Sequence, residues 1–571
     1  MISLIAVYED AAAIKEKMQN FFIKHHRILF YGTWLAINLV QSYYTELMDD
    51  EAFYWAYSRF PSFGYFEHPP LIALFIGAGY WLFKSELGVR FFIVLLNTAS
   101  IYIIRQLSEG KNDLLFYAIV LSISLTQLGG FIAAPDNVLI FFTALFFLTF
   151  RRFVSQMTLL NAFQLGIVMA LMLYSKYHGV LVIIFTLLSF PKLALKYQTY
   201  IAALVTTVLF LPHLYWQYKN EFDTLRYQLS ERNFNYRIGY TINYILGQLL
   251  IAGPLIGGLL IWWACCSYVQ SPLQRALKYC LVGIYVFFLV GSFRGKIEAN
   301  WTIAAFIPLI VLSHEYLDQK VQLQKWVYKT VPFTLIIVLF IRIALGTEIH
   351  FLGLDTKSEF YKNKMVADNI LSNAGQTPVI FLNSYARASK YWFYTGHISF
   401  SLNTANYHRN SYNYWPMEDS LIGKPAYVVG GRNSVVNDVP DPAGNPVVTG
   451  KKIDKYFSFS KVRFTGIKNV EIRNNNLQIK CGVKMPETYP TLLKEAPYDT
   501  MSVYIACYFN DRDNISYVKT NLHLSEIAKE PMQTTLSCSL DMPQMPRKLR
   551  IVLSTCLKNS FSINSDFFDL Q

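Results

Sequence analysis

Charged residues are scarce in this chain. Of its 571 residues only 16% are Asp, Glu, Lys or Arg, whereas 53% are hydrophobic. Up to about residue 346 the apolar residues fall in runs of roughly 14–24, the length needed to cross a hydrocarbon core. Beyond that point the runs become short and alternating. This distribution excludes a chain made only of soluble domains and predicts a polytopic membrane protein with a water-soluble tail.

Two familiar signals are missing as well. No small-residue cleavage site follows an apolar core near the N-terminus, so we expect no removable signal peptide and interpret residues 1–27 as a cytoplasmic lead-in. There is no convincing glycine-rich phosphate loop, so no nucleotide-sugar site is expected. The net charge of +13 is explained by cytoplasmic loops and anionic headgroups, and we expect no nucleic-acid partner.

About eleven apolar segments, and at most about 13, are candidate spans. They lie at 28–45, 89–105, 114–133, 137–150, 159–174, 178–190, 199–216, 241–264, 278–293, 301–314 and 330–346. The short run 71–83 follows Pro69-Pro70 and is interpreted as interfacial. The basic loops then share one side, as the positive-inside rule requires. The first loop, 46–88, and the tail are therefore expected outside the cytoplasm.

The first loop concentrates acidic and aromatic residues in "MDDEAFYWAYSRFPSFGYFEHPPLIALF", 48–75. From Asp50 onward the pattern predicts an amphipathic helix with Asp50, Tyr54 and Tyr57 on one face. Its Phe53 and Trp55 suit a membrane interface, which places the loop on the outer leaflet.

Glu67 and His68 end the same stretch, just before Pro69-Pro70, where extended geometry is favoured. We expect Asp50 and Glu67 to meet over one pocket from two separate elements. The alternative is that Asp49 and Asp50 only cap a surface helix.

Further polar residues are expected on the same outer side of the membrane. They are Asp136, Lys176, His178, Arg226, Arg294, Lys296 and Glu298. Two alternatives stay open, because Asp136 is also a candidate helix cap and Lys176 a candidate snorkelling anchor. Together, these cations and the two carboxylates indicate an anionic lipid headgroup with acid–base chemistry beside it.

"DEAFYW…GYFEHPPL" resembles the first outer loop of the GT-C glycosyltransferases. The branch is similar to the aminoarabinose-to-lipid-A transferases and the bacterial relatives of protein O-mannosyltransferases. Supporting matches, over roughly residues 28–430, are "SELGVR", "APDNVLIFF", "LYSKYHGVL", "PHLYW", "GKIEANWTIAAFIPL", "ASKYWFYTG" and "SLNTANYHRNSYNYWP". The "HPP" after Glu67 differs from the "EKP" of the lipid A enzymes, so the sugar and the acceptor stay open.

This resemblance implies a multi-pass glycosyltransferase of the bacterial cytoplasmic (inner) membrane. It would move a sugar from a polyprenyl-phosphate donor to a glycolipid, polysaccharide or protein acceptor on the outer face, by inverting displacement. Asp50 matches the catalytic carboxylate and Glu67 the second acidic position. The donor phosphate would be bound by Lys176, His178, Arg226, Arg294 and Lys296, and the supporting residues are Glu51, Tyr54, Tyr57, Asp136 and Glu298.

Two rival functions accompany that interpretation. One is a non-catalytic assembly protein whose C-terminal β-sandwich does the binding, although the pair of Asp50 and Glu67 argues against it. The other, a transporter or flippase of a lipid-linked sugar, would use the same cations without a base, although transporters place charge at mid-membrane in broken helices. The sequence assigns no definite cofactor, and Glu67 and His68 are candidate ligands of a divalent metal cation.

The sequence of the tail predicts two folded parts, which follow the membrane domain of residues 28–346. Residues 347–438 are expected as an α/β region, with strands at "TPVIFLN" and "PAYVVGG" and a helix at "YARASKYWFYTG". Residues 439–454 are expected as a Pro/Gly-rich linker. Residues 455–571 are expected as a β-sandwich with strands at "KVRFTGI", "NLQIKCGVKM", "SVYIACYF", "TTLSCSL" and "LRIVLSTCL". The four cysteines there are either disulfide partners or buried thiols.

Overall fold

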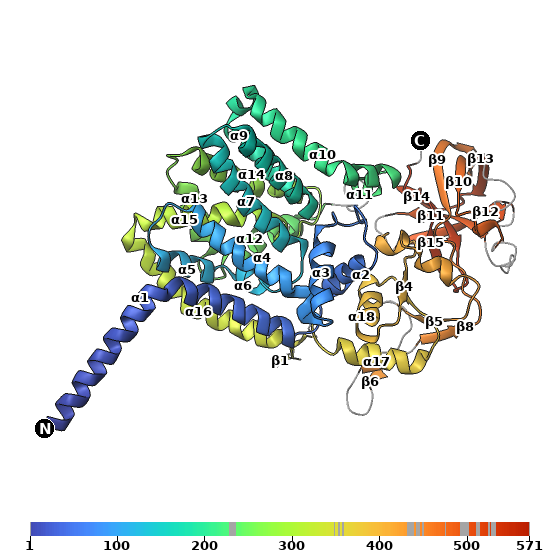
Figure 1. Ribbon diagram of the computed structural model, residues 1–571. Coiled ribbons are helices and arrows are strands. Elements are labelled where there is room, and N and C mark those ends of the chain that lie inside the picture. Colours follow the sequence, from blue (N-terminus) through green and yellow to red (C-terminus); the bar gives the residue numbers. More distant parts are fainter. Residues whose placement is uncertain are drawn as a thin grey trace.

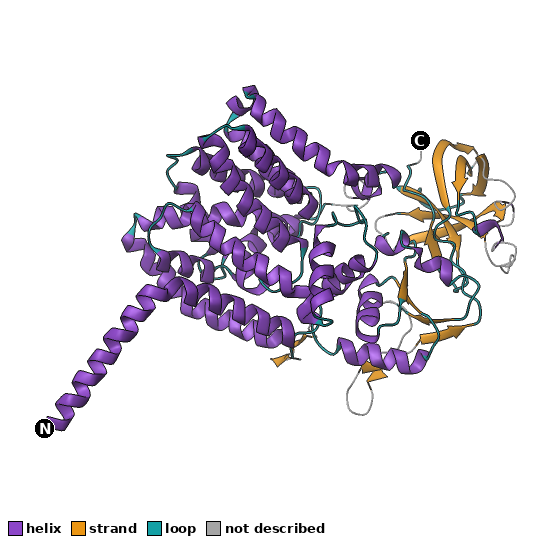
Figure 2. Cartoon of the chain, in the orientation of Figure 1, coloured by secondary structure: helices purple, strands orange, loops and turns teal. Residues whose placement is uncertain are grey.

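The computed structural model describes residues 2–227, 236–347, 349–351, 354–356, 359–430, 439–440, 446–447, 450–473, 475–491, 502–509, 514–523, 526 and 533–569. Helices make up the chain as far as Leu345, and a tail rich in strands follows (Figure 2). The first half of helix α1 protrudes from one end of the helical bundle, and the tail lies at the opposite end (Figure 1). The predicted architecture, a helical membrane domain with a sheet-rich tail, is confirmed.

Each predicted span falls on one helix or on two consecutive ones. They are α1 (Ile2–Tyr44), α4 (Glu86–Leu107), α5 (Asp113–Ser122), α6 (Ser124–Gly129), α7 (Pro135–Ser155), α8 (Leu159–Ser175), α9 (Gly179–Ser189), α10 (Tyr197–Lys219), α12 (Ile238–Ala252), α13 (Gly257–Cys266), α14 (Pro272–Ser292), η3 (Ala299–Ala305), α15 (Phe306–Asp318) and α16 (Val321–Leu345). Within the described residues, five of these are long and apolar enough to cross a membrane, or six with one bent pair. A multi-pass protein is confirmed, and the count of about eleven spans stays a prediction.

The segment 241–264 is not the single span that we expected. Its two halves, α12 and α13, meet at 87°. The break begins at Gly253, whose φ is +141°, followed by Pro254, which has no N–H to donate to a helix. A Cβ on Gly253 would lie 2.7 Å from the carbonyl oxygen of Ser122. The break therefore allows close contact with the end of α5, where the segment 114–133 is itself divided.

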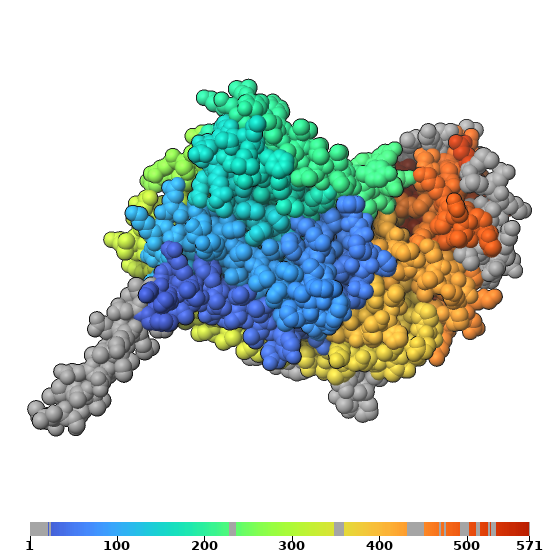
Figure 3. Space-filling model, viewed as in Figure 1, coloured from blue at the N-terminus to red at the C-terminus, as the bar shows by residue number. Residues whose placement is uncertain are grey.

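The first loop folds into α2 (Asp49–Arg59) and α3 (Leu71–Leu82). Phe53 and Trp55 of α2 are only 2% and 3% exposed. Trp55 packs edge-on against Trp392 and Phe393, two residues of tail helix α18 (Tyr385–Thr395). Our interpretation of these rings as lipid-interface residues was wrong, because aromatic side chains suit a protein interface equally well. Helix α2 lies between the bundle and the tail, and in Figure 3 the blue first loop borders the yellow and orange tail directly.

The α/β part of the tail is a small sheet with two helices, α17 (Asn363–Ala374) and α18. Its strands are β3 (Val379–Leu382), β4 (Ser399–Leu402), β5 (Ala426–Val429) and β8 (Gly450–Ile453), in the order β4-β3-β5-β8. The strand β8 pairs antiparallel with β5, so the last part of the expected linker 439–454 belongs to this sheet instead. Residues 441–445 and 448–449 of that linker lie outside the described residues. The short pairs β1 (Ile349–Phe351) with β2 (Leu354–Thr356), and β6 (Val439–Pro440) with β7 (Pro446–Val447), complete this part.

The end of the chain forms two antiparallel sheets that enclose an apolar core. One has the order β13-β10-β9 and the other β12-β11-β14-β15. The strands are β9 (Arg463–Arg473), β10 (Asn476–Lys484), β11 (Ser502–Tyr508), β12 (Ile515–His523), β13 (Gln533–Ser539), β14 (Lys548–Ser554) and β15 (Phe561–Ile563). All seven cysteines of the chain are free, and Cys481, Cys507 and Cys538 are buried. For these three residues the structure agrees with the second of the two alternatives, buried free thiols.

Candidate active site

A cavity of about 1080 Å³ opens between the bundle, the first loop and the tail. Its walls come from segments that are far apart in sequence: α2, the Glu67-His68 turn, the start of α7, the α8–α9 connection, residues 294–301 and the tail. The structure brings ten predicted site residues together in its lining. They are Asp50, Tyr54, Glu67, His68, Asp136, Lys176, His178, Arg294, Lys296 and Glu298.

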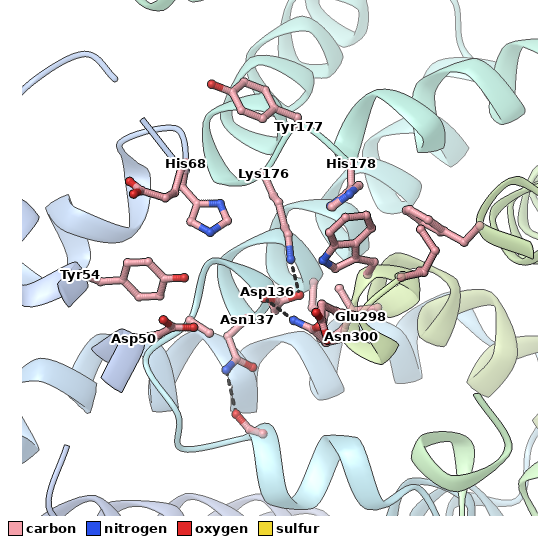
Figure 4. Close-up of a pocket in the computed structure, with 18 of the residues that line it drawn as sticks. Asp50, Tyr54, His68, Asp136, Asn137, Lys176, Tyr177, His178, Glu298 and Asn300 are labelled. Atoms are coloured by element: carbon pink, nitrogen blue, oxygen red, sulfur yellow. Dashed lines mark hydrogen bonds and ion pairs between the residues drawn. The ribbon is translucent and has the colours of Figure 1, made fainter. Parts of the chain in front are cut away.

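Asp50 occupies the first turn of α2 and faces the cavity beside Tyr54 and His68 (Figure 4). It does not cap the helix, because the N-cap residue is Met48, whose backbone N–H is bound by Glu51. The Tyr385 hydroxyl donates a hydrogen bond of 3.0 Å to Asp50 Oδ1. Burial raises the pKa of Asp50 to about 6, although the Tyr385 hydrogen bond opposes that rise. A carboxylate with this pKa is largely ionised at neutral pH, as a general base must be.

Glu67 is held on both of its oxygens. The Tyr57 hydroxyl donates to Oε2 over 2.5 Å and the Ser411 hydroxyl to the same atom over 2.7 Å. The backbone N–H of Ser411 donates to Oε1 over 3.2 Å. Burial raises the pKa of Glu67 to about 7 against these hydrogen bonds. Tyr57 does not line the cavity, and it contributes to the site by donating its hydrogen bond to Glu67.

Asp136 and Lys176 form an ion pair on the opposite wall of the cavity (Figure 4). Lys176 Nζ lies 2.8 Å from Asp136 Oδ1, with side chains that are 5% and 10% exposed. Asn300 donates to the other oxygen of Asp136 over 3.3 Å. The capping alternative for Asp136 is wrong, since Ala134 is the N-cap residue of α7. The snorkelling alternative for Lys176 is also wrong, because a buried and paired ammonium does not extend to the membrane surface.

Glu51, in the first turn of α2, is fully buried and is not part of the cavity lining. Arg90 of α4 donates to it through Nε over 2.7 Å, and Ala133 donates its backbone N–H over 2.7 Å. Arg90 also binds the carbonyl oxygens of Ser42 and Thr45 at the end of α1. This network fixes the start of α2, next to Asp50, relative to the segment that leads into α7 and Asp136.

Arg226 does not line the cavity, contrary to our expectation. It lies in the short helix α11 (Asp223–Arg226), where Nη1 is 2.8 Å from Asp566 of the tail. In the same cluster, Arg409 lies 2.7 Å from Asp566, and Arg463 lies 3.1 Å from Asp223. These charges connect the loop after α10 to both parts of the tail, so Arg226 is a residue of the interface between domains.

Of the remaining predicted cations in the lining, Arg294 and Lys296 are exposed and His178 is half-buried. Lys296 Nζ is 3.0 Å from Glu298, and both side chains are substantially exposed. The ring of His178 packs against Phe288 and Trp301, with centroids 5.2 and 5.3 Å away. The described residues contain no group of three His, Cys, Asp or Glu side chains placed to hold a metal ion. A metal at Glu67 and His68 would need other ligands, and this site stays a prediction.

Among the residues of the site that were absent from our predicted set are Arg90, Tyr385 and Ser411. Each lay inside a quoted motif, "SELGVR", "YARASKYWFYTG" or "HRNSYNYWP". Their roles depend on partners 39, 335 and 344 residues away. No local periodicity signals such pairings, although the buried charge of Arg90 within a span was itself a usable signal.

Comparison with known proteins gives the fold and a family match for part of the chain. Residues 67–216 match the family described as dolichyl-phosphate-mannose-protein mannosyltransferase. The lipid A galacturonosyltransferase RgtD of Rhizobium johnstonii is 24% identical over 292 aligned residues, and the alignment covers 47% of this chain and 60% of that protein. The present chain thus matches less than two thirds of its curated relative's length.

The solved structures of ArnT from Cupriavidus metallidurans share the fold. The apo structure superposes with a TM-score of 0.54 at 13% identity, over 72% of this chain and 94% of that one. The structure of ArnT bound to undecaprenyl phosphate gives 0.53 at 14% identity, over 71% and 93%. The predicted resemblance is confirmed to this extent: residues 67–216 match the dolichyl-phosphate-mannose-protein mannosyltransferase family, and the chain shares the fold of ArnT.

Proposed function

We propose that this protein is an integral-membrane glycosyltransferase that moves a sugar from a polyprenyl-phosphate donor to an acceptor hydroxyl. The observation that carries the proposal is the cavity in which Asp50 and Lys176 face the same space from opposite walls. One wall supplies a carboxylate able to take a proton, and the other supplies cations for an anionic leaving group.

The chemistry is a single displacement with inversion at the anomeric carbon. The acceptor oxygen attacks that carbon while Asp50 takes its proton, and the bond from the carbon to the phosphate oxygen breaks. The departing lipid phosphate gains negative charge, which Lys176, Arg294 and Lys296 stabilise electrostatically. Glu67 orients the acceptor from beside Asp50.

We place this reaction on the outer face of a bacterial cytoplasmic membrane. The tail lies at one end of the helical bundle (Figure 1), and the cavity is there as well, since Tyr385 and His408 of the tail line it. The basic loops of the opposite end would face the cytoplasm, in agreement with the positive-inside rule. A lipid-linked donor suits this location because the lipid carries the activated sugar to that face.

The comparisons support the donor class more strongly than the acceptor. One relative is named a lipid A galacturonosyltransferase, the matching family is named for a dolichyl-phosphate-mannose donor, and ArnT was solved with undecaprenyl phosphate. Glycolipid, polysaccharide and protein acceptors all remain candidates, and so do several sugars.

Mass spectrometry of envelope glycolipids and glycoproteins, from cells with and without the gene, tests the proposal. We expect one acceptor class to lose a mass corresponding to a single sugar residue when the gene is deleted, and to regain it on complementation. Unchanged acceptors together with a lipid-linked sugar trapped on the cytoplasmic face would instead identify a flippase.

A further inference from the structure

The two carboxylates of the candidate site both receive hydrogen bonds from the tail. Tyr385, the first residue of α18, donates to Asp50. Ser411, in the short helix η4 (Ser411–Asn413), donates to Glu67 through both its hydroxyl and its backbone N–H. The membrane domain contributes the carboxylates, and the tail contributes the groups that orient them.

We propose that Tyr385 and Ser411 are positioning residues, so that the active site is completed only when the α/β part of the tail is docked on the first loop. This inference rests on the proposed function, since it assigns roles around Asp50 and Glu67. It also gives the α/β part of the tail a direct task in catalysis.

The surroundings of Tyr385 favour a specific orienting role over general packing. Its ring lies 4.4 Å from the ring of Phe53, so the side chain is fixed on α2 itself. Of the tail residues that the structure describes, Tyr385 and His408 line the cavity. The hydroxyl holds Oδ1 of Asp50, and Oδ2 takes no part in that hydrogen bond. A general base needs an oxygen within hydrogen-bond reach of the proton that it takes, and Oδ2 is the atom that we assign to this task.

The electrostatic consequence has a definite sign. A hydroxyl that donates to a carboxylate stabilises the charged form and lowers the pKa. Three other carboxylates act in the opposite direction: Asp49 on the same helix, Glu359 before α17 and Asp136 on α7 all raise its pKa. Removing the Tyr385 hydroxyl therefore shifts the protonation of Asp50 to higher pH.

The test compares Tyr385→Phe with wild type in the full-length protein, reconstituted with a polyprenyl-phosphate sugar and an acceptor. We expect kcat to fall about tenfold, as when a hydrogen bond to a charged group is lost, with KM for the donor changed less than about threefold. The acidic limb of the kcat/KM profile should move up by about one pH unit. Ser411→Ala, which keeps the backbone N–H, should lower kcat less.

Tyr394→Phe is the matched control on the same helix. Its hydroxyl accepts a hydrogen bond from the backbone N–H of Leu47, ahead of α2, and has no contact with Asp50. We expect a wild-type pH profile from this variant. The inference would be overturned if Tyr394→Phe lost as much kcat as Tyr385→Phe. It would also be overturned if Tyr385→Phe kept the wild-type kcat and pH profile. In either case α18 would contribute packing alone.

Two further measurements keep the outcomes distinguishable. If the wild-type protein transfers no sugar, the proposed function fails; if Asp50→Asn is inactive while Tyr385→Phe behaves as wild type, only the present inference fails. Infrared difference titration of the Asp50 carboxyl, assigned with Asp50→Asn, reports its protonation without any turnover. An unshifted titration in a folded Tyr385→Phe protein would contradict the inference.

Discussion

Lys176 Nζ lies 2.8 Å from Asp136 Oδ1 inside the cavity, so a cation proposed to bind the donor phosphate already has a carboxylate partner. The pair is almost fully buried, and Asn300 supports it through the second oxygen of Asp136. A phosphate that approaches Lys176 must therefore share the ammonium with Asp136 or displace it.

Asp136→Asn should reveal that competition. Removing one partner of a buried ion pair leaves an uncompensated charge, at a cost of about 3–5 kcal/mol in the free energy of unfolding. Because the phosphate then has no competitor for Lys176, polyprenyl phosphate should raise the Tm of this variant more than that of wild type. Thermal unfolding with and without the lipid phosphate measures both effects. If polyprenyl phosphate raised the Tm of the variant and of wild type equally, Lys176 would not be a phosphate-binding residue.

The Arg90–Glu51 pair, which is outside the cavity lining, predicts a second stability effect. Arg90→Met should destabilise the protein by about 3–5 kcal/mol, because Glu51 remains buried without its cation. The double variant with Glu51→Gln should recover much of that loss. The exposed pair Lys484–Glu221 is the control, where Lys484→Met should cost at most about 1 kcal/mol. A double variant no more stable than Arg90→Met would show that the pair contributes through packing alone.

The raised pKa of Asp50 predicts a conflict between activity and stability. Its pKa is about 6 in the folded protein, against 3.8 ordinarily. The folded state therefore holds this proton more tightly than the unfolded state, and stability falls as pH rises from about 4 to about 6. Asp50→Asn should be more stable than wild type at pH 8, by on the order of 1–3 kcal/mol, and show no gain at pH 4. Denaturation at the two pH values measures this; a gain that is equal at both would contradict the assigned pKa.

The proposed topology predicts that the C-terminal end of the chain lies outside the cytoplasm. A reporter enzyme that is active only in the periplasm, fused after Gln571, should show activity. A reporter active only in the cytoplasm should be silent at Gln571 and active when fused within the basic loop at Lys320. The reverse pattern would place the cavity on the cytoplasmic face.

The helices and most of the tail strands could be predicted from the sequence, because the residue patterns that indicate them are local. Apolar run length marks spans, and alternation places Ile479, Ile505 and Leu536 in the sandwich core. The sequence also brought Asp50, Glu67 and Lys176 into one candidate set, through charge and the family motifs.

The errors came from partners that are distant in the chain. From sequence alone, Trp55 was predicted to lie at the membrane interface, but it packs against α18. Arg226 was predicted to bind the donor phosphate, but it pairs with Asp566. Strand β8 was assigned to a linker because Gly450, Lys451 and Lys452 give no alternation signal. Each case depends on tertiary contacts that single-sequence periodicity does not contain.

The comparison of Asp50→Asn with Asp49→Asn, in a reconstituted assay with defined donor and acceptor, tests the central claim most directly. Asp49 pairs with Lys390 at the interface with the tail and is not in the cavity lining. General-base catalysis contributes about 10²–10⁴-fold, so Asp50→Asn should fold normally and lose transfer by roughly that factor. Asp49→Asn should retain nearly full activity. Near-wild-type transfer by Asp50→Asn, with Asp49→Asn inactive, would show that Asp50 is not the base.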